Sequence, residues 1–226
     1  MAQPWTTLAR QATDEGLLEL RRRGARDFLI TVGGLVLMNS LANRSEVVLG
    51  QLGCQKLQHY RQPRVLVGGL GMGFTLKAAL DALPDEADVV VAELNPVVVE
   101  WCRGPLAELT GAAVNDRRVQ VEICDVADLV KRAVNSPSNR FDAVIFDLYK
   151  GPHAKTDAVG DPLYGSRAIA NVHKILRPNG RFTIWGEHFD AGFDRRLRQA
   201  GFATSSQRPG RGGYRHVVFV AEKVSV

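Results

Sequence analysis

Residues 64–77, with the sequence RVLVGGLGMGFTLK, decide the fold class of this chain. An apolar run leads into a glycine-rich loop, in which Gly69, Gly71 and Gly73 alternate with larger residues. A helical pattern begins directly afterwards, near Phe74. Because glycine has no side chain, the backbone of such a loop can lie close to a ligand, and the helix that follows offers it unpaired N–H groups. The stretch predicts a strand, a ligand-binding loop and a helix, although a tight strand-to-helix turn has the same pattern.

Strands and helices alternate from this stretch onward. We expect strands at 65–67, 89–92, 119–123, 143–146 and 181–185, helices at about 74–83, 96–109, 126–134, 164–176 and 191–200, and a final hairpin at about 202–207 and 214–221. Continuous apolar strands that are spaced by helices indicate a parallel sheet covered on both faces. The predicted fold class is therefore α/β, with a Rossmann-like sheet.

The first forty residues differ from the rest of the chain. Short β-type runs are separated by glycines, among them a Gly-Gly pair, which is a hairpin signal because glycine accepts positive φ. We expect a small N-terminal β-hairpin appendage at 1–42 and a Rossmann-like, cofactor-binding domain at 43–226. A helix capped by Ser45 or Asn43 should connect the two and run to about Gln58.

Acidic residues follow three of the expected strands. Glu93 ends the second strand, Asp125 follows the third and Asp147 follows the fourth. Ligands of open α/β sheets bind at the carboxyl ends of the strands, so these acids should meet the glycine loop there, with Glu93 accepting hydrogen bonds from a ribose. The alternative is that each acid only caps the helix after it. The predicted cofactor-binding residues are Gly69, Gly71, Met72, Gly73, Glu93, Leu94, Asp125, Val126 and Asp147.

The cofactor pattern favours S-adenosylmethionine over a nicotinamide dinucleotide. The loop lacks the last glycine of the dinucleotide-binding pattern, because residues 74–76 read FTL. Acids at the ends of both the second and the third strand suit a nucleoside better than a pyrophosphate bridge. We therefore expect a class I methyltransferase sheet that binds S-adenosylmethionine or a close relative of it.

Further stretches complete the pattern. They are RDFLI at 26–30, LMNS at 37–40, SE at 45–46, VAELNP at 91–96, and Asp147 followed by Gly151-Pro152. Together with the glycine loop, they resemble the spermidine synthase family, and within it a bacterial group of spermidine-synthase-like proteins. The resemblance covers nearly the whole chain. It implies a methyltransferase-type sheet, an N-terminal β appendage and a homodimer. It also implies that Glu93 holds the ribose, that Asp125 holds the adenine end and that Asp147 faces the reacting centre.

Two departures from the family pattern bear on the reaction. Met72 stands where the family has an aspartate that holds the amine of decarboxylated S-adenosylmethionine, and Lys150 stands where it has a second acid that grips the diamine. A diamine carries ammonium groups with pKa values near 10.4, which a dry pocket must pair with acids. The sequence therefore favours methyl transfer from S-adenosylmethionine to a small-molecule acceptor. Aminopropyl transfer from decarboxylated S-adenosylmethionine, or another reaction at the sulfonium, is the alternative.

Asp147 and Tyr149 are the candidate catalytic residues. The aspartate can act as a general base or as an electrostatic partner of an attacking amine, and the tyrosine can orient the substrate. A loop cap and a surface aromatic residue are the alternatives. Lys150, His153 and Lys155 make this loop basic, which suits an anionic substrate as well as a solvated loop. The pattern leaves open the roles of Lys150, His153, Glu187 and His188.

The length, cysteine spacing and net charge of the chain indicate its class of protein. The 226 residues suffice for one α/β domain with a small appendage, and no apolar run is long enough to cross a membrane. Residues 1–10 lack the apolar core of a signal peptide, so we expect a cytoplasmic protein. The three cysteines have no metal-ligand spacing, and the net charge of +5 is spread along the chain, which argues against metal and nucleic acid. We expect an enzyme, with a regulatory or nucleic-acid-binding module as the non-enzyme alternative.

Overall fold

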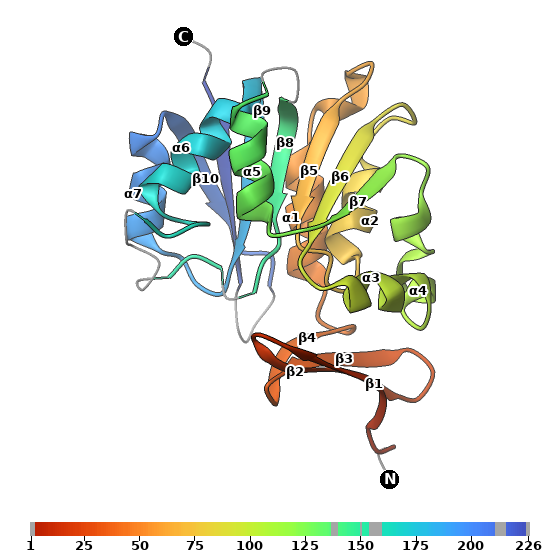
Figure 1. Cartoon of the computed structure of the whole chain (residues 1–226). Helices are drawn as coiled ribbons and strands as arrows, with labels where there is room; N and C mark the ends of the chain where they lie inside the picture. The colour runs from red at the N-terminus through yellow and green to blue at the C-terminus, as the bar shows by residue number, and fades with distance from the viewer. Residues whose placement is uncertain (1–2, 137–139, 150, 154–159, 211–215, 225–226) are drawn as a thin grey trace.

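The computed structural model describes residues 3–136, 140–149, 151–153, 160–210 and 216–224. They form two β-sheets, and helices surround the larger one (Figure 1). The smaller sheet is antiparallel and consists of β1 (Thr6–Thr13), β2 (Gly16–Arg23), β3 (Asp27–Val32) and β4 (Leu35–Asn39), paired in that order. It lies below the larger sheet in the view of Figure 1.

The larger sheet has the strand order β10-β11-β9-β8-β5-β6-β7. Its strands are β5 (Arg64–Gly68), β6 (Asp88–Glu93), β7 (Val119–Ile123), β8 (Phe141–Phe146), β9 (Leu176–Gly186), β10 (Phe202–Gln207) and β11 (Val217–Lys223). Strands β5 to β9 are parallel, whereas β11 pairs antiparallel with both β9 and β10. The predicted α/β class with a Rossmann-like sheet is confirmed.

Helices cover both faces of the larger sheet. One face carries α1 (Arg44–Cys54), α2 (Phe74–Asp81) and α3 (Pro96–Arg103), and the other carries α5 (Val126–Val134), α6 (Ser166–Ile175) and α7 (Ala191–Gln199). The short helices η1 (Leu57–His59), α4 (Ala107–Thr110) and η2 (Ala113–Asn115) lie in the connections. Because side chains alternate along a strand, Val65 and Val67 enter the hydrophobic cluster on the first face, and Leu66 enters the cluster on the second. This double burial explains the continuous apolar runs.

Two predicted helix limits are wrong for local reasons. The helix expected at 96–109 is two helices, because α3 ends at Arg103, with Gly104 as its C-cap, before α4 begins. The helix expected to reach residue 58 ends at Cys54, because Lys56 has a left-handed backbone conformation with φ 78°. A helix cannot continue through such a residue.

The N-terminal part also differs from the sequence-based prediction. Strand β1 is not among the expected strands, because Thr6–Thr13 shows no apolar face. Asn43 occupies the N-cap position of α1 without a side-chain cap, and its amide donates a hydrogen bond to the carbonyl oxygen of Ser40 (3.0 Å) instead. The hydroxyl of Ser45 is engaged by the neighbouring Glu46. The side chains of Asn43 and Ser45 therefore make hydrogen bonds that do not cap α1.

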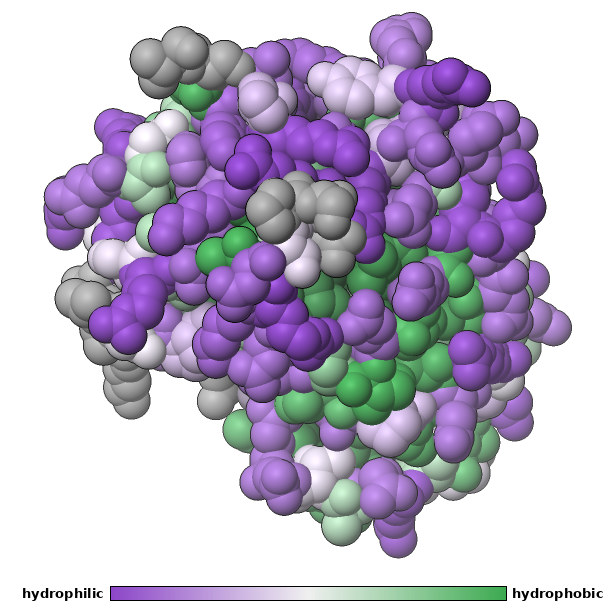
Figure 2. Space-filling model, turned by 45° about the horizontal axis from the view of Figure 1, so that its top comes forward, coloured by the Kyte–Doolittle hydropathy of each residue, from purple (hydrophilic) through white to green (hydrophobic). Residues whose placement is uncertain are grey.

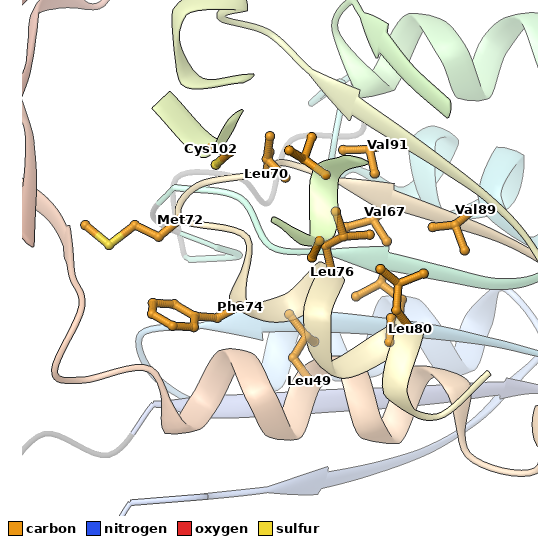
Figure 3. Close-up of a cluster of buried hydrophobic side chains, with 14 of the residues drawn as sticks. Leu49, Val67, Leu70, Met72, Phe74, Leu76, Leu80, Val89, Val91 and Cys102 are labelled. Atoms are coloured by element: carbon orange, nitrogen blue, oxygen red, sulfur yellow. The ribbon is translucent and has the colours of Figure 1, made fainter. Parts of the chain in front are cut away.

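The smaller sheet packs on the glycine loop of the larger one. Leu20 of β2 and Ile30 of β3 are fully buried, and they share a hydrophobic cluster with Leu70, Met72 and Phe74. Figure 3 shows the side chains of Leu70, Met72 and Phe74 in this cluster. This packing places the smaller sheet over the loop that is expected to bind a ligand. The predicted domain boundary after residue 42 stays a prediction.

The surface is mostly polar on the face shown in Figure 2, where hydrophilic side chains surround a contiguous apolar area. Large apolar side chains that are exposed include Leu35 and Val36 of β4 and Leu41 after it. None of the helices in the described ranges combines the length and the apolar character that a membrane span requires.

Candidate active site

A cavity of about 780 Å³ lies at the carboxyl ends of the parallel strands. Residues that follow or end β5, β6, β7 and β8 line one side of it, and residues of the smaller sheet, such as Leu18, Ile30 and Met38, line the other. The predicted site residues around it are Gly69, Gly71, Glu93, Leu94, Asp125, Val126, Asp147 and Tyr149. This is the place at which open α/β sheets bind their ligands.

The glycine loop needs its glycines where it approaches other backbone. Gly69 has φ +85°, and a Cβ atom there would lie 2.4 Å from the carbonyl oxygen of Asp147. Gly71 has φ +53°, and a Cβ atom there would meet the side chain of Met38 at 2.9 Å. The loop therefore runs close both to the end of β8 and to the smaller sheet. Gly73 also has a left-handed conformation, but it begins α2 and does not line the cavity.

The structure does not place Met72 at the cavity. Its side chain is 0% exposed and lies in the hydrophobic cluster of Figure 3. The reason is the alternation within the loop, in which Gly69 and Gly71 face the cavity while Leu70 and Met72 join the core. Met72 and Gly73 do not line the cavity, and the prediction that they contact the cofactor stays a prediction.

Glu93 both lines the cavity and holds the glycine loop. Its Oε2 accepts a hydrogen bond from the backbone N–H of Leu70 (2.8 Å), and its Oε1 accepts one from that of Asn95 (2.9 Å). The residue is 7% exposed, and burial raises the pKa of its carboxyl group despite these two donors. A carboxylate oxygen has two lone pairs, so each oxygen keeps the capacity to accept from a ribose hydroxyl.

Asp125 both caps a helix and lines the cavity, which are the two roles that the sequence leaves open for it. It is the N-cap of α5, where its Oδ1 accepts a hydrogen bond from the backbone N–H of Ala127 (2.8 Å). It is also exposed and lines the cavity, next to the buried Val126. Leu94, which is 53% exposed, lies on the same side. Capping therefore positions the acid at the cavity without using both of its oxygens.

Asp147 lies between the glycine loop and α2. Its backbone N–H donates to the carbonyl oxygen of Gly68 (2.9 Å), and its Oδ2 accepts a hydrogen bond from the hydroxyl of Thr75 (2.6 Å). Burial, and then the negative charge of Glu46, raise the pKa of Asp147 to about 7, against the smaller opposing effect of Thr75. A carboxyl group that titrates near neutral pH can exchange protons with a substrate.

Glu46, in the first turn of α1, is an acid that the sequence-based site does not include. It lines the cavity and is 7% exposed, and its Oε2 accepts a hydrogen bond from the hydroxyl of Ser45 (2.6 Å). The hydroxyl of Ser45 also lies 3.2 Å from Nε1 of Trp185 and 3.0 Å from Nδ1 of His216. The sequence contains two signals for Glu46: the SE stretch at 45–46 belongs to the family resemblance, and an acid stands in the first turn of an expected helix. The second signal is also typical of a favourable interaction with the helix dipole.

A model of the spermine/spermidine synthase domain family matches residues 50–191. The chain belongs to this family. Similar curated proteins include the polyamine aminopropyltransferase of Clostridium tetani (31% identical over 131 residues, 57% of this chain and 42% of the relative) and polyamine aminopropyltransferase 1 of Hyperthermus butylicus (34% over 126 residues, 54% and 40%). This spermine/spermidine synthase homologue thus matches less than half of the length of these relatives.

Solved structures of spermidine synthases share the fold of this homologue. The enzyme from Thermotoga maritima superposes with a TM-score of 0.75 at 19% identity, over 96% of this chain and 72% of the other. A spermidine synthase in complex with the transition state analogue AdoDATO gives a TM-score of 0.73 at 18% identity, over the same shares.

The comparisons contradict the methyl transfer that the sequence favours. The matched family is that of the spermine/spermidine synthases, and the curated relatives are polyamine aminopropyltransferases. The case for methyl transfer depends on Met72 and Lys150. The side chain of Met72 lies in the core, and Lys150 lies outside the described residues.

The cavity of this homologue is acidic. Six carboxylates line it: Glu15, Glu46, Glu93, Asp125, Asp147 and Asp161. Among the described lining residues there is one histidine, His153, and no lysine or arginine. Glu187 and His188 are not among them, and Tyr149 is 38% exposed at the edge of the cavity. Lys150 and Lys155 lie outside the described residues, so the alternatives of an anionic substrate and a solvated loop stay predictions. The described ranges contain no group of three or more His, Cys, Asp or Glu side chains that could hold a metal ion.

Proposed function

We propose that this chain transfers the 3-aminopropyl group of decarboxylated S-adenosylmethionine to an amine of a small-molecule acceptor. The observation that carries the proposal is the charge of the cavity, which has six carboxylates and, in the described residues, no lysine or arginine, in a chain of net charge +5. A decarboxylated sulfonium nucleoside with its ammonium group and an amine acceptor are both cations, so the cavity matches the charge of both substrates.

The reaction needs one group that accepts a proton. An amine with a pKa near 10.4 is an ammonium ion at neutral pH and must lose a proton before it can attack. Its nitrogen then attacks the propyl carbon next to the sulfonium; the new C–N bond forms, the C–S bond breaks, and sulfur keeps the electron pair in neutral 5′-methylthioadenosine. Asp147 is suited to take the proton, because its raised pKa of about 7 makes it a stronger base than an ordinary aspartate.

The order of the strands supports a division of the cavity. Along the edge of the sheet, β7, β6, β5, β8 and β9 follow one another. We assign the nucleoside to the end with Glu93 and Asp125, the reacting centre to Asp147, and the acceptor to the side of β9, where Trp185 lines the cavity. Tyr149, which follows Asp147 closely in the chain, is proposed to orient the acceptor.

The proposal is tested by product analysis. The purified chain is incubated with decarboxylated S-adenosylmethionine and 1,4-diaminobutane, and the products are separated by mass spectrometry. We expect spermidine and 5′-methylthioadenosine in equal amounts, and a rate at least about 100-fold lower for Asp147→Asn, since general base catalysis contributes about 10²–10⁴-fold. A wild-type chain that forms neither product would contradict the proposal.

Two further proposals concern the oligomeric state and the cellular location of the chain. We propose a homodimer, for which the exposed Leu35, Val36 and Leu41 support an apolar contact surface. We also propose a cytoplasmic location, which the three free cysteines support, because oxidising compartments favour disulfides. Light scattering of the purified chain tests the dimer, and a monomeric mass at micromolar concentration would contradict it.

A further inference from the structure

Glu46 is a buried carboxylate that has no ion-pair partner among the described residues. It is 7% exposed, and within the described residues its one hydrogen-bond partner is the hydroxyl of Ser45, with no lysine, arginine or histidine in an ion pair with it. It lines the cavity together with Asp147, and Thr75 links the two by donating towards both the Asp147 carboxylate (2.6 Å) and the backbone oxygen of Glu46 (3.2 Å). Two acids that face one cavity, with no lysine or arginine among its described lining residues, leave a large desolvation cost, which a bound cation would offset.

The position of Glu46 assigns it to one end of the cavity. Its partner Ser45 contacts Trp185 of β9 and His216, which precedes β11, and both of these strands lie on the side of β8 away from β6. Glu93, which ends β6, occupies the opposite end. The carboxylate of Glu46 is therefore next to Asp147 on the side away from the proposed nucleoside subsite.

We propose that Glu46 binds the ammonium form of the acceptor amine beside Asp147, and that Ser45, held by Trp185 and His216, positions its carboxylate. This inference rests on the proposed function, and it adds the residue that selects a cationic acceptor. A charge-assisted hydrogen bond from ammonium to Glu46 places the nitrogen next to the base that takes its proton.

The hydrogen bonds of Ser45 explain how the carboxylate is held. A serine hydroxyl has one proton and two lone pairs. Its proton is donated to Glu46 (2.6 Å), and one lone pair accepts from the indole N–H of Trp185 (3.2 Å). The contact of 3.0 Å with Nδ1 of His216 is then an N–H donated to the second lone pair. Ser45 is thus fully paired, which fixes the direction of its bond to Glu46 and leaves the Oε1 side of the carboxylate for a ligand.

The test separates charge from shape at position 46. Titration calorimetry measures the binding of 1,4-diaminobutane to the chain saturated with 5′-methylthioadenosine, and separately the binding of 5′-methylthioadenosine alone. Glu46→Gln keeps the size and the acceptor for Ser45 but removes the charge. We expect diamine affinity to fall at least about tenfold, with nucleoside affinity unchanged within about twofold. Glu46→Asp should lose less, and Glu86→Gln, which changes an exposed acid outside the cavity, should lose nothing.

Ser45→Ala provides a second variant in case Glu46→Gln does not fold. It should weaken diamine binding by about two- to fivefold and raise the acceptor KM by the same factor, without a change in nucleoside affinity. Equal diamine binding by wild type and both variants would overturn the role of Glu46 alone. A parallel loss of nucleoside affinity would reduce it to a structural residue. A wild-type chain that binds no diamine would overturn the proposed function and this inference together.

Discussion

The folded structure changes the protonation of Asp147. Its pKa is raised to about 7 from the ordinary value of 3.8, first by burial and then by Glu46. Between these two pH values the folded protein keeps a proton that the unfolded chain has lost, so the stability of the wild type falls as the pH rises from about 4 to about 7.

Asp147→Asn removes this pH dependence. The asparagine oxygen can still accept the hydrogen bond from Thr75, but the side chain never becomes charged. We expect Tm to be equal for variant and wild type near pH 4, and higher for the variant by at least about 2 °C at pH 8. Differential scanning fluorimetry at the two pH values measures both. A variant that is less stable at pH 8 would show that the ionised carboxylate is favourable in the fold.

Met72 belongs to the core, and a charge there should be destabilising. Its side chain is 0% exposed among apolar neighbours. We expect Met72→Asp, which introduces the aspartate that the family resemblance implies, to lower the free energy of unfolding by at least about 3 kcal/mol. Met72→Leu should cost less than about 1.5 kcal/mol. Urea denaturation compares the two; wild-type stability with faster turnover in Met72→Asp would mean that this side chain reaches the cavity.

Residue types at the strand ends could be predicted from sequence, but their partners could not. Glu93, Asp125 and Asp147 are evident because each follows an apolar strand. Glu46 is not, because its role depends on contacts with Ser45, Trp185 and His216, two of which lie more than a hundred residues away. The second role of Glu93, as an anchor of the glycine loop, is hidden in the sequence for the same reason.

At the scale of elements, the glycine loop carries the clearest steric requirement. Gly69 has φ +85° and no room for a Cβ atom, which would lie 2.4 Å from the backbone oxygen of Asp147. Gly111 also has positive φ, +62°, but nothing lies within 4 Å of the position of its Cβ atom. Gly111→Ala is therefore a matched control that has the backbone strain without the clash.

We expect Gly111→Ala to cost about 1–2 kcal/mol through the left-handed conformation alone. Gly69→Ala should cost about 1–3 kcal/mol more, because the loop or the end of β8 must move. It should also weaken the binding of 5′-methylthioadenosine, which Gly111→Ala should not. Chemical denaturation and calorimetry on both variants supply the comparison, and equal costs would contradict the close packing of the loop on β8.

Several regular elements follow from the sequence, although not all of them are buried on both faces. Helix α5 (Val126–Val134) and strand β10 (Phe202–Gln207) have the limits that their patterns predict. Strand β1 is not predicted from the sequence, because its residues alternate between half-buried and exposed without an apolar face. Its pairing with β2, and not its side-chain pattern, makes it a strand. The helix break at Gly104 is not predicted from the sequence either, because apolar residues continue on both sides of it.

At the scale of the whole molecule, the net charge of the chain and the charge of the cavity act on a cationic acceptor in opposite directions. The net charge of +5 repels a cationic acceptor at long range, whereas the six carboxylates of the cavity attract it at short range. Salt screens charges separated by more than about 10 Å at 0.1 M. If the cavity dominates, the Michaelis constant for the diamine should rise about two- to tenfold between about 50 and 500 mM salt, while the affinity for neutral 5′-methylthioadenosine stays constant. A Michaelis constant that falls with salt would mean that the net charge dominates.

The choice between donors tests the central claim most directly. The chain is given 1,4-diaminobutane with equal concentrations of S-adenosylmethionine and its decarboxylated form, and all products are measured by mass spectrometry in one reaction. The acidic cavity around Asp147 predicts spermidine and 5′-methylthioadenosine, with no S-adenosylhomocysteine, because the carboxylate of S-adenosylmethionine would meet the carboxylates of the cavity. N-methylated diamine together with S-adenosylhomocysteine, and no spermidine, would contradict the assignment as an aminopropyltransferase.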